Sequence, residues 1–458
     1  MRPLGTIDRD IFQSQLDGIA EEMSKALSRS AYSPIIWDVY DYSCAVFTPQ
    51  GEMLAQAETI PAQLGTMSTA FKGVTAAIPL AEWKPGDVFL CNDPYRGCTH
   101  TLDLTMFSPV FHEGVLVAIT STIAHHIDVG GARPGTTALD ATEIFMEGLI
   151  IPPCRLIDGG KPVDLVFEFI RSNFRYPNPS LGDLRAQIAG CRIAERRLAE
   201  LAQRHGAERF TQLATACLDY GELYARGIIA AIPDGTYEAE TLIEDGISSP
   251  EHISLKVRLA VADSRVLVDF AGSSLQRRCG LNCPWSSTIS MTRYAVRCVV
   301  APETSQNGGL DRCVLVVAPE GNILNPMSPA AVSSRHYTQR AVADVVLKAL
   351  ARAAPERAAA CSQISVPIFG AEGIDDRPAR PGRRRGRYIT FDIMGGGMGG
   401  SPRSDGLNAV DTHGGNCALI SAEVMETASP VRVLRTALVP GSGGVGEYRG
   451  GLALERDY

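Results

Sequence analysis

Residues 115 to 124 read Val-Leu-Val-Ala-Ile-Thr-Ser-Thr-Ile-Ala, an apolar and β-branched run without a charge. A run of this kind predicts a buried strand. His125 and His126 follow it directly, Asp128 comes next, and glycines at 130 and 131 then turn the chain. The buried strand therefore carries titratable side chains where it meets a loop, a position in which they are well held but open to solvent.

A second cluster of polar side chains follows a strand predicted at 88 to 91. Residues 92 to 97 (Asn-Asp-Pro-Tyr-Arg-Gly) are turn-forming and end this strand, and His100 and Asp103 come next. Three of the 8 histidines of the chain lie in these two motifs. Imidazoles and carboxylates at strand ends suit a divalent ion such as Mn, Fe or Zn that keeps open coordination positions. The alternative is ordinary loop structure, because an Asn-Asp-Pro turn or a lone histidine beside a strand is common.

The spacing of these residues sets two conditions on a metal site. Adjacent residues of a strand point to opposite faces of the sheet, so only one of His125 and His126 is expected to be a ligand. His100 and Asp103 are three residues apart and would face opposite ways in a regular strand. We therefore expect a local turn or bulge between them.

These motifs resemble the hydantoinase B/oxoprolinase family. The resemblance rests on residues 92 to 97, on Thr99, His100 and Asp103, and on residues 124 to 131. It continues in order through Glu147–Pro153, Asp269–Ser273, Asn307–Gly309, Gly395–Gly399 and Ser442–Gly446. The chain departs from the family pattern at Cys98, where a second glycine is usual. Family members also continue past residues 449 to 451, whereas this sequence ends at Tyr458, so a truncation is one interpretation of that end.

The resemblance implies a fourth metal ligand. By likeness to the family, Asp41 joins His100, Asp103 and His125 in binding the ion. An edge-strand charge that faces water is the alternative for Asp41. Two carboxylates and two neutral imidazoles would balance a 2+ ion and leave room for one or two waters.

Three residues remain as catalytic candidates. His126 and Asp128 lie next to the expected ligands and are candidates for acid–base catalysis or for supporting the ligands. Glu147 lies in another segment that resembles the family and is a further candidate. A solvated charge on a helix surface is the alternative for Glu147.

The pattern of apolar residues predicts an α+β fold with more than one domain. A chain of 458 residues is too long for one simple core. We expect an N-terminal α+β domain with the metal site, a mixed sheet and helices at 1–180, a helical segment at 181–232, and a β-rich α+β domain with helices at 233–458. Residues 132–183 are expected to be rich in loops. Helices are predicted at 8–29, 61–83, 182–205, 208–230, 286–302 and 336–353, and strands at 37–47, 53–55, 88–91, 115–124 and across 235–269.

Charge and composition argue against several classes of function. The chain has 43 Lys and Arg residues against 51 Asp and Glu residues, and its net charge of −8 argues against general binding to nucleic acids or anionic membranes. The sequence has neither a signal-peptide pattern nor an apolar run of membrane length, so a cytoplasmic location is expected. The basic run at 377–388 has no aromatic residues between its charges and is expected to be a solvated loop.

The resemblance implies a role in a two-component, ATP-dependent enzyme. The glycine runs at 159–160 and 395–400 lack the Lys-Ser/Thr pair of a phosphate-binding loop, so no ATP site is predicted in this chain. A hydantoinase A-like partner with an actin-like nucleotide fold would bind ATP and phosphorylate the oxygen of a cyclic amide such as a hydantoin, 5-oxoproline or a lactam. The metal-bearing chain would then open the ring with a metal-bound water. The alternatives are a subunit of an ATP-dependent ketone carboxylase, in which the metal stabilises an enolate, and a non-catalytic assembly subunit.

Overall fold

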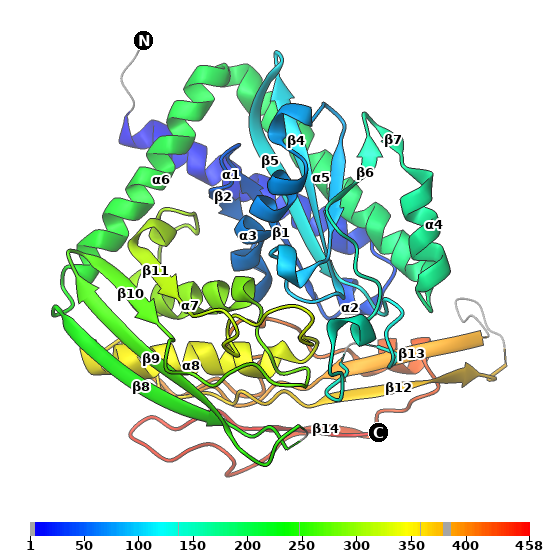
Figure 1. The fold of residues 1–458 in the computed structure, drawn as a ribbon, viewed down its shortest axis with the longest axis vertical. Coiled ribbons are helices and arrows are strands. Elements are labelled where there is room, and N and C mark those ends of the chain that lie inside the picture. The colour runs from blue at the N-terminus through cyan, green and yellow to red at the C-terminus, as the bar shows by residue number, and fades with distance from the viewer. Residues whose placement is uncertain (1–4, 136, 247, 358, 379–385) are drawn as a thin grey trace.

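The buried strand predicted from the sequence lies inside a seven-stranded sheet (Figure 1). In the computed structural model, which describes residues 5–135, 137–246, 248–357, 359–378 and 386–458, this strand is β5 (Val115–His125). The other strands are β1 (Tyr42–Phe47), β2 (Met53–Gln56), β3 (Val88–Cys91), β4 (Asp103–His112), β6 (Cys154–Asp158) and β7 (Lys161–Pro162). Their order across the sheet is β2-β1-β5-β4-β3-β6-β7, which places β5 near the middle.

The sheet is antiparallel between every pair of neighbours, where the sequence led us to expect a mixed sheet. The physical reason lies in the connections. Glu113 and Gly114, both with positive φ, form the two-residue link between β4 and β5, and a short turn at 48–52 links β1 to β2. Such short links allow only antiparallel neighbours, because a parallel pair needs a long crossover.

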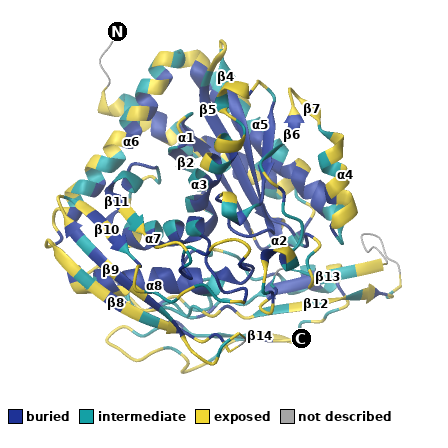
Figure 2. Ribbon diagram, viewed as in Figure 1, coloured by how far each residue is buried: buried dark blue, intermediate teal, exposed yellow. Residues whose placement is uncertain are grey.

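Helices cover both faces of this sheet (Figure 2). Alternate residues of β1 divide between two cores, since Cys44 and Val46 pack on one face and Ala45 and Phe47 on the other. This burial on both faces explains why β5 is apolar along most of its length. The first face is covered by α1 (Thr6–Ser30), α5 (Pro177–His205) and α6 (Ala207–Ile229), and the second by α3 (Pro61–Ala77).

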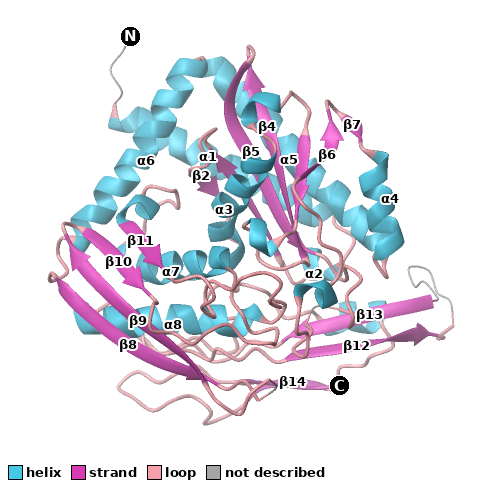
Figure 3. Ribbon diagram, viewed as in Figure 1, coloured by secondary structure: helices cyan, strands magenta, loops and turns pink. Residues whose placement is uncertain are grey.

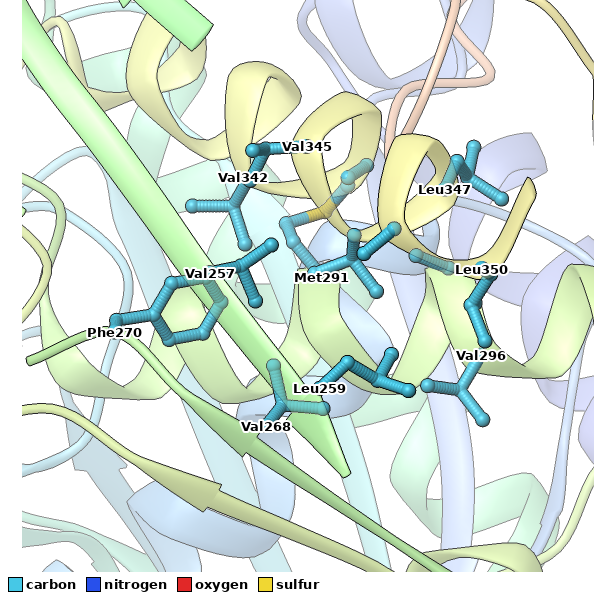
Figure 4. Close-up of a cluster of buried hydrophobic side chains, with 14 of the residues drawn as sticks. Val257, Leu259, Val268, Phe270, Met291, Val296, Val342, Val345, Leu347 and Leu350 are labelled. Atoms are coloured by element: carbon cyan, nitrogen blue, oxygen red, sulfur yellow. The ribbon is translucent and has the colours of Figure 1, made fainter. Parts of the chain in front are cut away.

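The second half of the chain is built on a four-stranded sheet with one buried face. Residues of β9 alternate between buried and more exposed positions, as in a sheet that is packed on one side only. Figure 4 shows the core between this sheet and two helices, where Val257 and Phe270 from the sheet side meet Met291 and Val342. The strand order is β11-β10-β9-β8, and the only parallel pair is β10 with β11. The elements are β8 (Gly235–Ile243), β9 (Ile253–Ala262), β10 (Arg265–Asp269), β11 (Val314–Val317), α7 (Trp285–Val300) and α8 (Arg335–Ala353).

The C-terminal segment returns to the first half (Figure 3). Its residues Phe391, Ile420 and Met425 are buried in the same core as α1 and β1. This segment contains the paired strands β12 (Ile368–Asp375) and β13 (Gly386–Ile393), the pair β14 (Arg435–Leu438) and β15 (Leu454–Asp457), and α9 (Ala422–Ala428). The remaining elements are α2 (Pro34–Trp37), α4 (Asp164–Asn173) and the 3₁₀ turns η1 (Leu80–Glu82), η2 (Pro94–Arg96), η3 (Ile144–Glu147) and η4 (Leu310–Cys313).

The α+β class predicted from the sequence is confirmed, and most predicted elements lie within a few residues of their observed bounds. Residues 132–183 hold more structure than expected, because α4 lies inside this range and α5 begins at Pro177. The domain boundaries at 180 and 232 stay predictions. Part of the basic run, residues 379–385, lies outside the described residues. No helix within the described ranges has both the length and the apolar character needed to cross a membrane.

Candidate metal centre

Three strand ends bring three of the predicted ligands into one row. Asp103 at the start of β4 pairs with His125 at the end of β5. The backbone N–H of His125 donates to the carbonyl oxygen of Asp41, at 3.1 Å, so Asp41 continues the row just before β1 begins. Side chains of directly opposed residues share a face of the sheet. The three side chains therefore point to the same face, which is the face covered by α3.

A turn brings His100 to the same row. Residues 101 and 102 form the turn, and the backbone N–H of Asp103 donates to the carbonyl oxygen of His100 at 3.2 Å. Nε2 of His100 lies 3.2 Å from Oδ2 of Asp103, and the ring centroids of His100 and His125 are 5.1 Å apart. One ligand atom from each of His100, Asp103 and His125 lies within 4.8 Å of the others. The turn is the one that the three-residue spacing required, and these three buried residues can hold a metal ion.

Asp41 stands beside this group and is linked to it by Gln63 of α3. The amide nitrogen Nε2 of Gln63 donates to Oδ1 of Asp41 at 2.8 Å and also lies 3.4 Å from Oδ1 of Asp103. The hydroxyl of Ser43 donates to Oε1 of Gln63 at 2.9 Å, which fixes the orientation of the amide. Gln63 thus holds the two carboxylates at one side of the site. Ligation by Asp41 stays a prediction.

The protonation states of the group match the needs of a cation. Burial, with the neighbouring His100, lowers the pKa of His125 to about 3, and burial, with Arg335, lowers the pKa of His100. Burial acts to raise the pKa of Asp103, but His100 and Arg335 outweigh it and hold that pKa below its ordinary value. Burial and the nearby Asp103 raise the pKa of Asp41 well above its ordinary value. Neutral imidazoles and an ionised Asp103 are the forms in which these residues bind metal ions.

The other half of the site comes from α8 and from residues 411–417. Together with the row of ligands, these segments line a small pocket that is partly open to solvent. The guanidinium of Arg335 donates to Oδ2 of Asp103 at 3.0 Å, and that of Arg340 pairs with Asp411. His336 and Gln339 also line the pocket, and the apolar part of its lining is made of Val366, Ile368, Phe391 and Ile393.

Sequence reasoning missed this second half. One available signal was the sequence Asp-Thr-His-Gly-Gly at 411–415, which combines the same residue types as the His-Ile-Asp-Val-Gly-Gly motif at 126–131. Another was the group Arg335, His336, Gln339 and Arg340 in a helix whose other residues are mostly apolar. Buried polar residues of this kind usually have a partner or a ligand.

Glu147 lies outside the pocket and holds one of its walls. Its Oε1 accepts hydrogen bonds from the backbone N–H groups of Val332 (2.6 Å) and Ser333 (2.7 Å), directly before Arg335. Only 4% of Glu147 is exposed, and this burial raises the pKa of its carboxyl to about 7. Glu147 is therefore placed to position the segment that precedes α8, and a direct part in catalysis stays a prediction.

His126 and Asp128 also lie outside the pocket. His126 points to the opposite face of the sheet, as the strand period required, and its Nε2 lies 3.2 Å from Oε1 of Gln187 on α5. Asp128 accepts hydrogen bonds from the backbone N–H groups of Gly130 and Gly135 and from the guanidinium of Arg175. These contacts tie the loop after β5 in place. The catalytic roles expected for the two residues stay predictions.

Comparison with known proteins gives the same family as the sequence motifs. Residues 6–458 match the family described as hydantoinase B/oxoprolinase. The chain is 30% identical over 473 residues to a subunit of a putative D-/L-hydantoinase of Pseudomonas sp., covering 100% of this chain and 78% of that protein. It is 31% identical to the beta subunit of the caprolactamase of Pseudomonas jessenii, covering 98% of this chain and 77% of the relative.

Two solved structures share the fold. A crystal structure of the ATP-dependent caprolactamase from Pseudomonas jessenii superposes with a TM-score of 0.88 at 29% identity, over 99% of this chain and 78% of that chain. A nucleotide-free acetone carboxylase superposes with a TM-score of 0.89 at 21% identity, over 98% of this chain and 61% of that chain. At 21% identity the second match is a likeness of fold alone. The family match over nearly the full sequence shows that this chain belongs to the hydantoinase B/oxoprolinase family.

Proposed function

We propose that this chain is the metal-bearing subunit of an ATP-dependent hydrolase that opens cyclic amides such as hydantoins, 5-oxoproline or lactams. The observation that carries the proposal is the convergence of His100, Asp103 and His125 in a buried pocket of a chain from this family. Relatives named for hydantoinase and caprolactamase activity support the substrate class. The likeness to acetone carboxylase is one of fold and gives no separate support to ketone carboxylation.

The side chains of the pocket fit a divalent cation. Nδ1 of His125 is buried and has no hydrogen-bond partner among the described residues, and Nε2 of His100 faces the carboxylate of Asp103 at 3.2 Å. Buried nitrogens of this kind are rare unless a ligand or a metal completes them. We propose that Asp41, His100, Asp103 and His125 hold the ion, with Gln63 positioning both carboxylates. When bound, a divalent ion supplies Lewis acidity and lowers the pKa of a coordinated water.

The other pocket residues would orient the amide and move protons. Val366, Ile368 and Phe391 present an apolar wall that suits the methylene groups of a ring. His336 lines the pocket with an Nε2 that has no partner, whereas His126 and Asp128 face elsewhere. We therefore propose His336 as the group that takes a proton from the attacking water and passes it to the departing ring nitrogen.

The reaction needs a partner for its ATP step. An unactivated amide is a poor electrophile, and phosphorylation of its oxygen activates the carbonyl carbon. Water adds to this carbon, the bond to the ring nitrogen breaks as the nitrogen takes a proton, and a second water hydrolyses the remaining acyl phosphate to the open-chain carboxylate and inorganic phosphate. This sequence has no phosphate-binding loop motif. We propose that ATP is bound by a hydantoinase A-like partner, which phosphorylates the amide; the relative named as the beta subunit of a caprolactamase supports an enzyme of more than one kind of chain.

The test combines metal analysis with turnover. The full chain is purified with its partner chain and compared with the variants His100→Ala and Asp103→Ala. About one divalent ion per native chain is expected, lost in both variants, together with ring opening that needs both ATP and the partner. A native chain without metal whose variants behave like it, or ring opening without ATP, would contradict the proposal.

A further inference from the structure

The pocket has a row of cationic and polar side chains beside the candidate metal ligands. Arg335, His336, Gln339 and Arg340 lie on α8 at the helical spacing that places them on neighbouring turns of one face. Arg340 is only 5% exposed. Its Nη2 bonds Asp411, but its Nε and Nη1 are buried and have no hydrogen-bond partner among the described residues. Nε of Arg335 and Nε2 of His336 also lack partners.

Pairing with Asp411 does not account for the donors of Arg340. A guanidinium has five N–H donors in a fixed planar fork. The carboxylate of Asp411 takes one nitrogen of Arg340 with Oδ1, and its Oδ2 accepts the backbone N–H of Cys417 at 3.1 Å. Buried donors without a partner are costly, so a group that accepts from them on binding is favoured. Neither Nε nor Nη1 of Arg340 makes a hydrogen bond to a residue that the structure describes.

The charge of the pocket points to the kind of acceptor. The lining carries three carboxyl groups (Asp41, Asp103 and Asp411) and two guanidinium groups (Arg335 and Arg340), so its formal charge is −1 when all three carboxyl groups are ionised, as they would be around a bound cation. A divalent ion changes this charge to +1. A bound oxyanion then compensates the excess positive charge inside a buried site, where an uncompensated charge is unfavourable. A planar guanidinium also matches the paired oxygens of a phosphoryl or carboxylate group.

We propose that Arg340, with the Nε of Arg335, forms a binding site for an oxyanion beside the candidate metal centre, in the same pocket. The site takes the phosphoryl group of the activated amide or the carboxylate of a substrate such as 5-oxoproline. Both groups carry anionic oxygens that accept charge-assisted hydrogen bonds from a guanidinium. This inference rests on the proposed function for the identity of its ligand, but its test needs no turnover.

The test measures the binding of small anions by calorimetry. The full chain, loaded with a divalent ion and freed of excess metal, is titrated with inorganic phosphate. It is also titrated with 5-oxoproline and with 2-pyrrolidinone, which has the same ring without the carboxylate. The variant is Arg340→Gln, and the matched control is Arg352→Gln, which removes an exposed arginine of the same helix. Elemental analysis confirms that all proteins carry the same amount of metal.

A phosphoryl site predicts that Arg340→Gln raises the Kd for phosphate at least about tenfold, the range typical for a charge-assisted hydrogen bond. A carboxylate site predicts that the variant loses the preference for 5-oxoproline over 2-pyrrolidinone. Either result supports the proposal and identifies the ligand group. In both cases Arg352→Gln binds like the native chain.

A second variant guards against misfolding. Arg340→Gln leaves Asp411 buried without its partner, so the double variant Arg340→Gln/Asp411→Asn removes the pair together. If either folded, metal-loaded variant binds phosphate as the native chain does and keeps its preference for 5-oxoproline, the proposal is overturned. It is equally overturned if the native chain binds no phosphate and does not prefer 5-oxoproline. The two proposals can fail separately. If the Arg340 variants lose anion binding but the native chain with its partner shows no ATP-dependent ring opening, the anion site is supported and only the proposed function is refuted.

Discussion

The buried carboxyl of Glu147 predicts a dependence of stability on pH that one substitution removes. Burial raises the pKa of this group from 4.5 to about 7 in the folded chain. The folded state therefore binds the proton more tightly than the unfolded state, so the contribution of Glu147 to stability is fully present below pH 4.5 and is lost as the pH rises towards 7. The pKa difference corresponds to roughly 3 kcal/mol of unfolding free energy at 1.36 kcal/mol per unit.

The variant Glu147→Gln isolates this contribution. A glutamine keeps an oxygen that can accept from the N–H groups of Val332 and Ser333, and it cannot ionise. The stability of the variant relative to the native chain should therefore rise between pH 5 and pH 8, by up to roughly 3 kcal/mol. Above pH 8 the difference should be constant. The measurement is urea unfolding of both proteins in steps of half a pH unit.

The control for this experiment is Glu143→Gln, which changes an exposed carboxylate four residues earlier. Its stability difference from the native chain should vary little over the same pH range. A flat difference for Glu147→Gln between pH 5 and pH 8 would refute the reasoning, because it would mean that burial does not raise the pKa of Glu147. A difference that falls with pH would show that the hydrogen bonds from residues 332 and 333 outweigh the burial.

Two matched pairs test the site and the packing. His125→Asn should abolish metal binding, measured by elemental analysis, whereas His126→Asn should retain it. The reason is that adjacent residues of a strand face opposite sides of the sheet. Equal loss of metal in both variants would contradict this orientation of the two side chains. In thermal unfolding, Gly73→Ala should lower the midpoint temperature, because the added Cβ would overlap the carbonyl oxygen of Arg96. Gly18→Ala places its Cβ in open space and should raise the free energy of unfolding by roughly 0.5–1 kcal/mol, because alanine has the higher helix propensity. Equal effects of the two glycine variants would show that contacts at Gly73 do not matter.

The sequence carried enough information for the ligand half of the site because that half is local. Asp103 and His125 lie on two strands joined by a two-residue link, so a single register places them opposite each other. The turn between His100 and Asp103 followed from the strand period alone. Such short-range geometry is encoded in residue spacing.

The wall of the pocket could not be predicted in the same way. Arg335 reaches Asp103 across 232 residues of sequence, and Asp411 meets Arg340 across 71. These contacts depend on how the core around α7 and α8 packs against the first half of the chain. That packing cannot be predicted from the spacing of residues in the sequence. The same limit applies to His126, Asp128 and Glu147, whose positions in the sequence motifs suggested catalytic roles. In the fold these residues contact Gln187, Arg175 and the backbone of Val332, respectively, and these contacts stabilise the segments around the pocket.

The contact between Arg335 and Asp103 makes the candidate metal centre depend on both halves of the chain. Oδ2 of Asp103 accepts from Arg335 and from the hydroxyl of Thr99, while Oδ1 has only the longer contact to Gln63. Arg335 and Thr99 therefore fix the orientation of this carboxylate, and Oδ1 is the oxygen with the weaker hydrogen bonding. Glu147 holds residues 332 and 333, directly before Arg335, so it is placed to position Arg335 and through it Asp103. Residues outside the candidate ligand set are thus placed to orient the carboxylate of Asp103, and we expect a carboxylate that its neighbours do not orient to bind a cation less tightly.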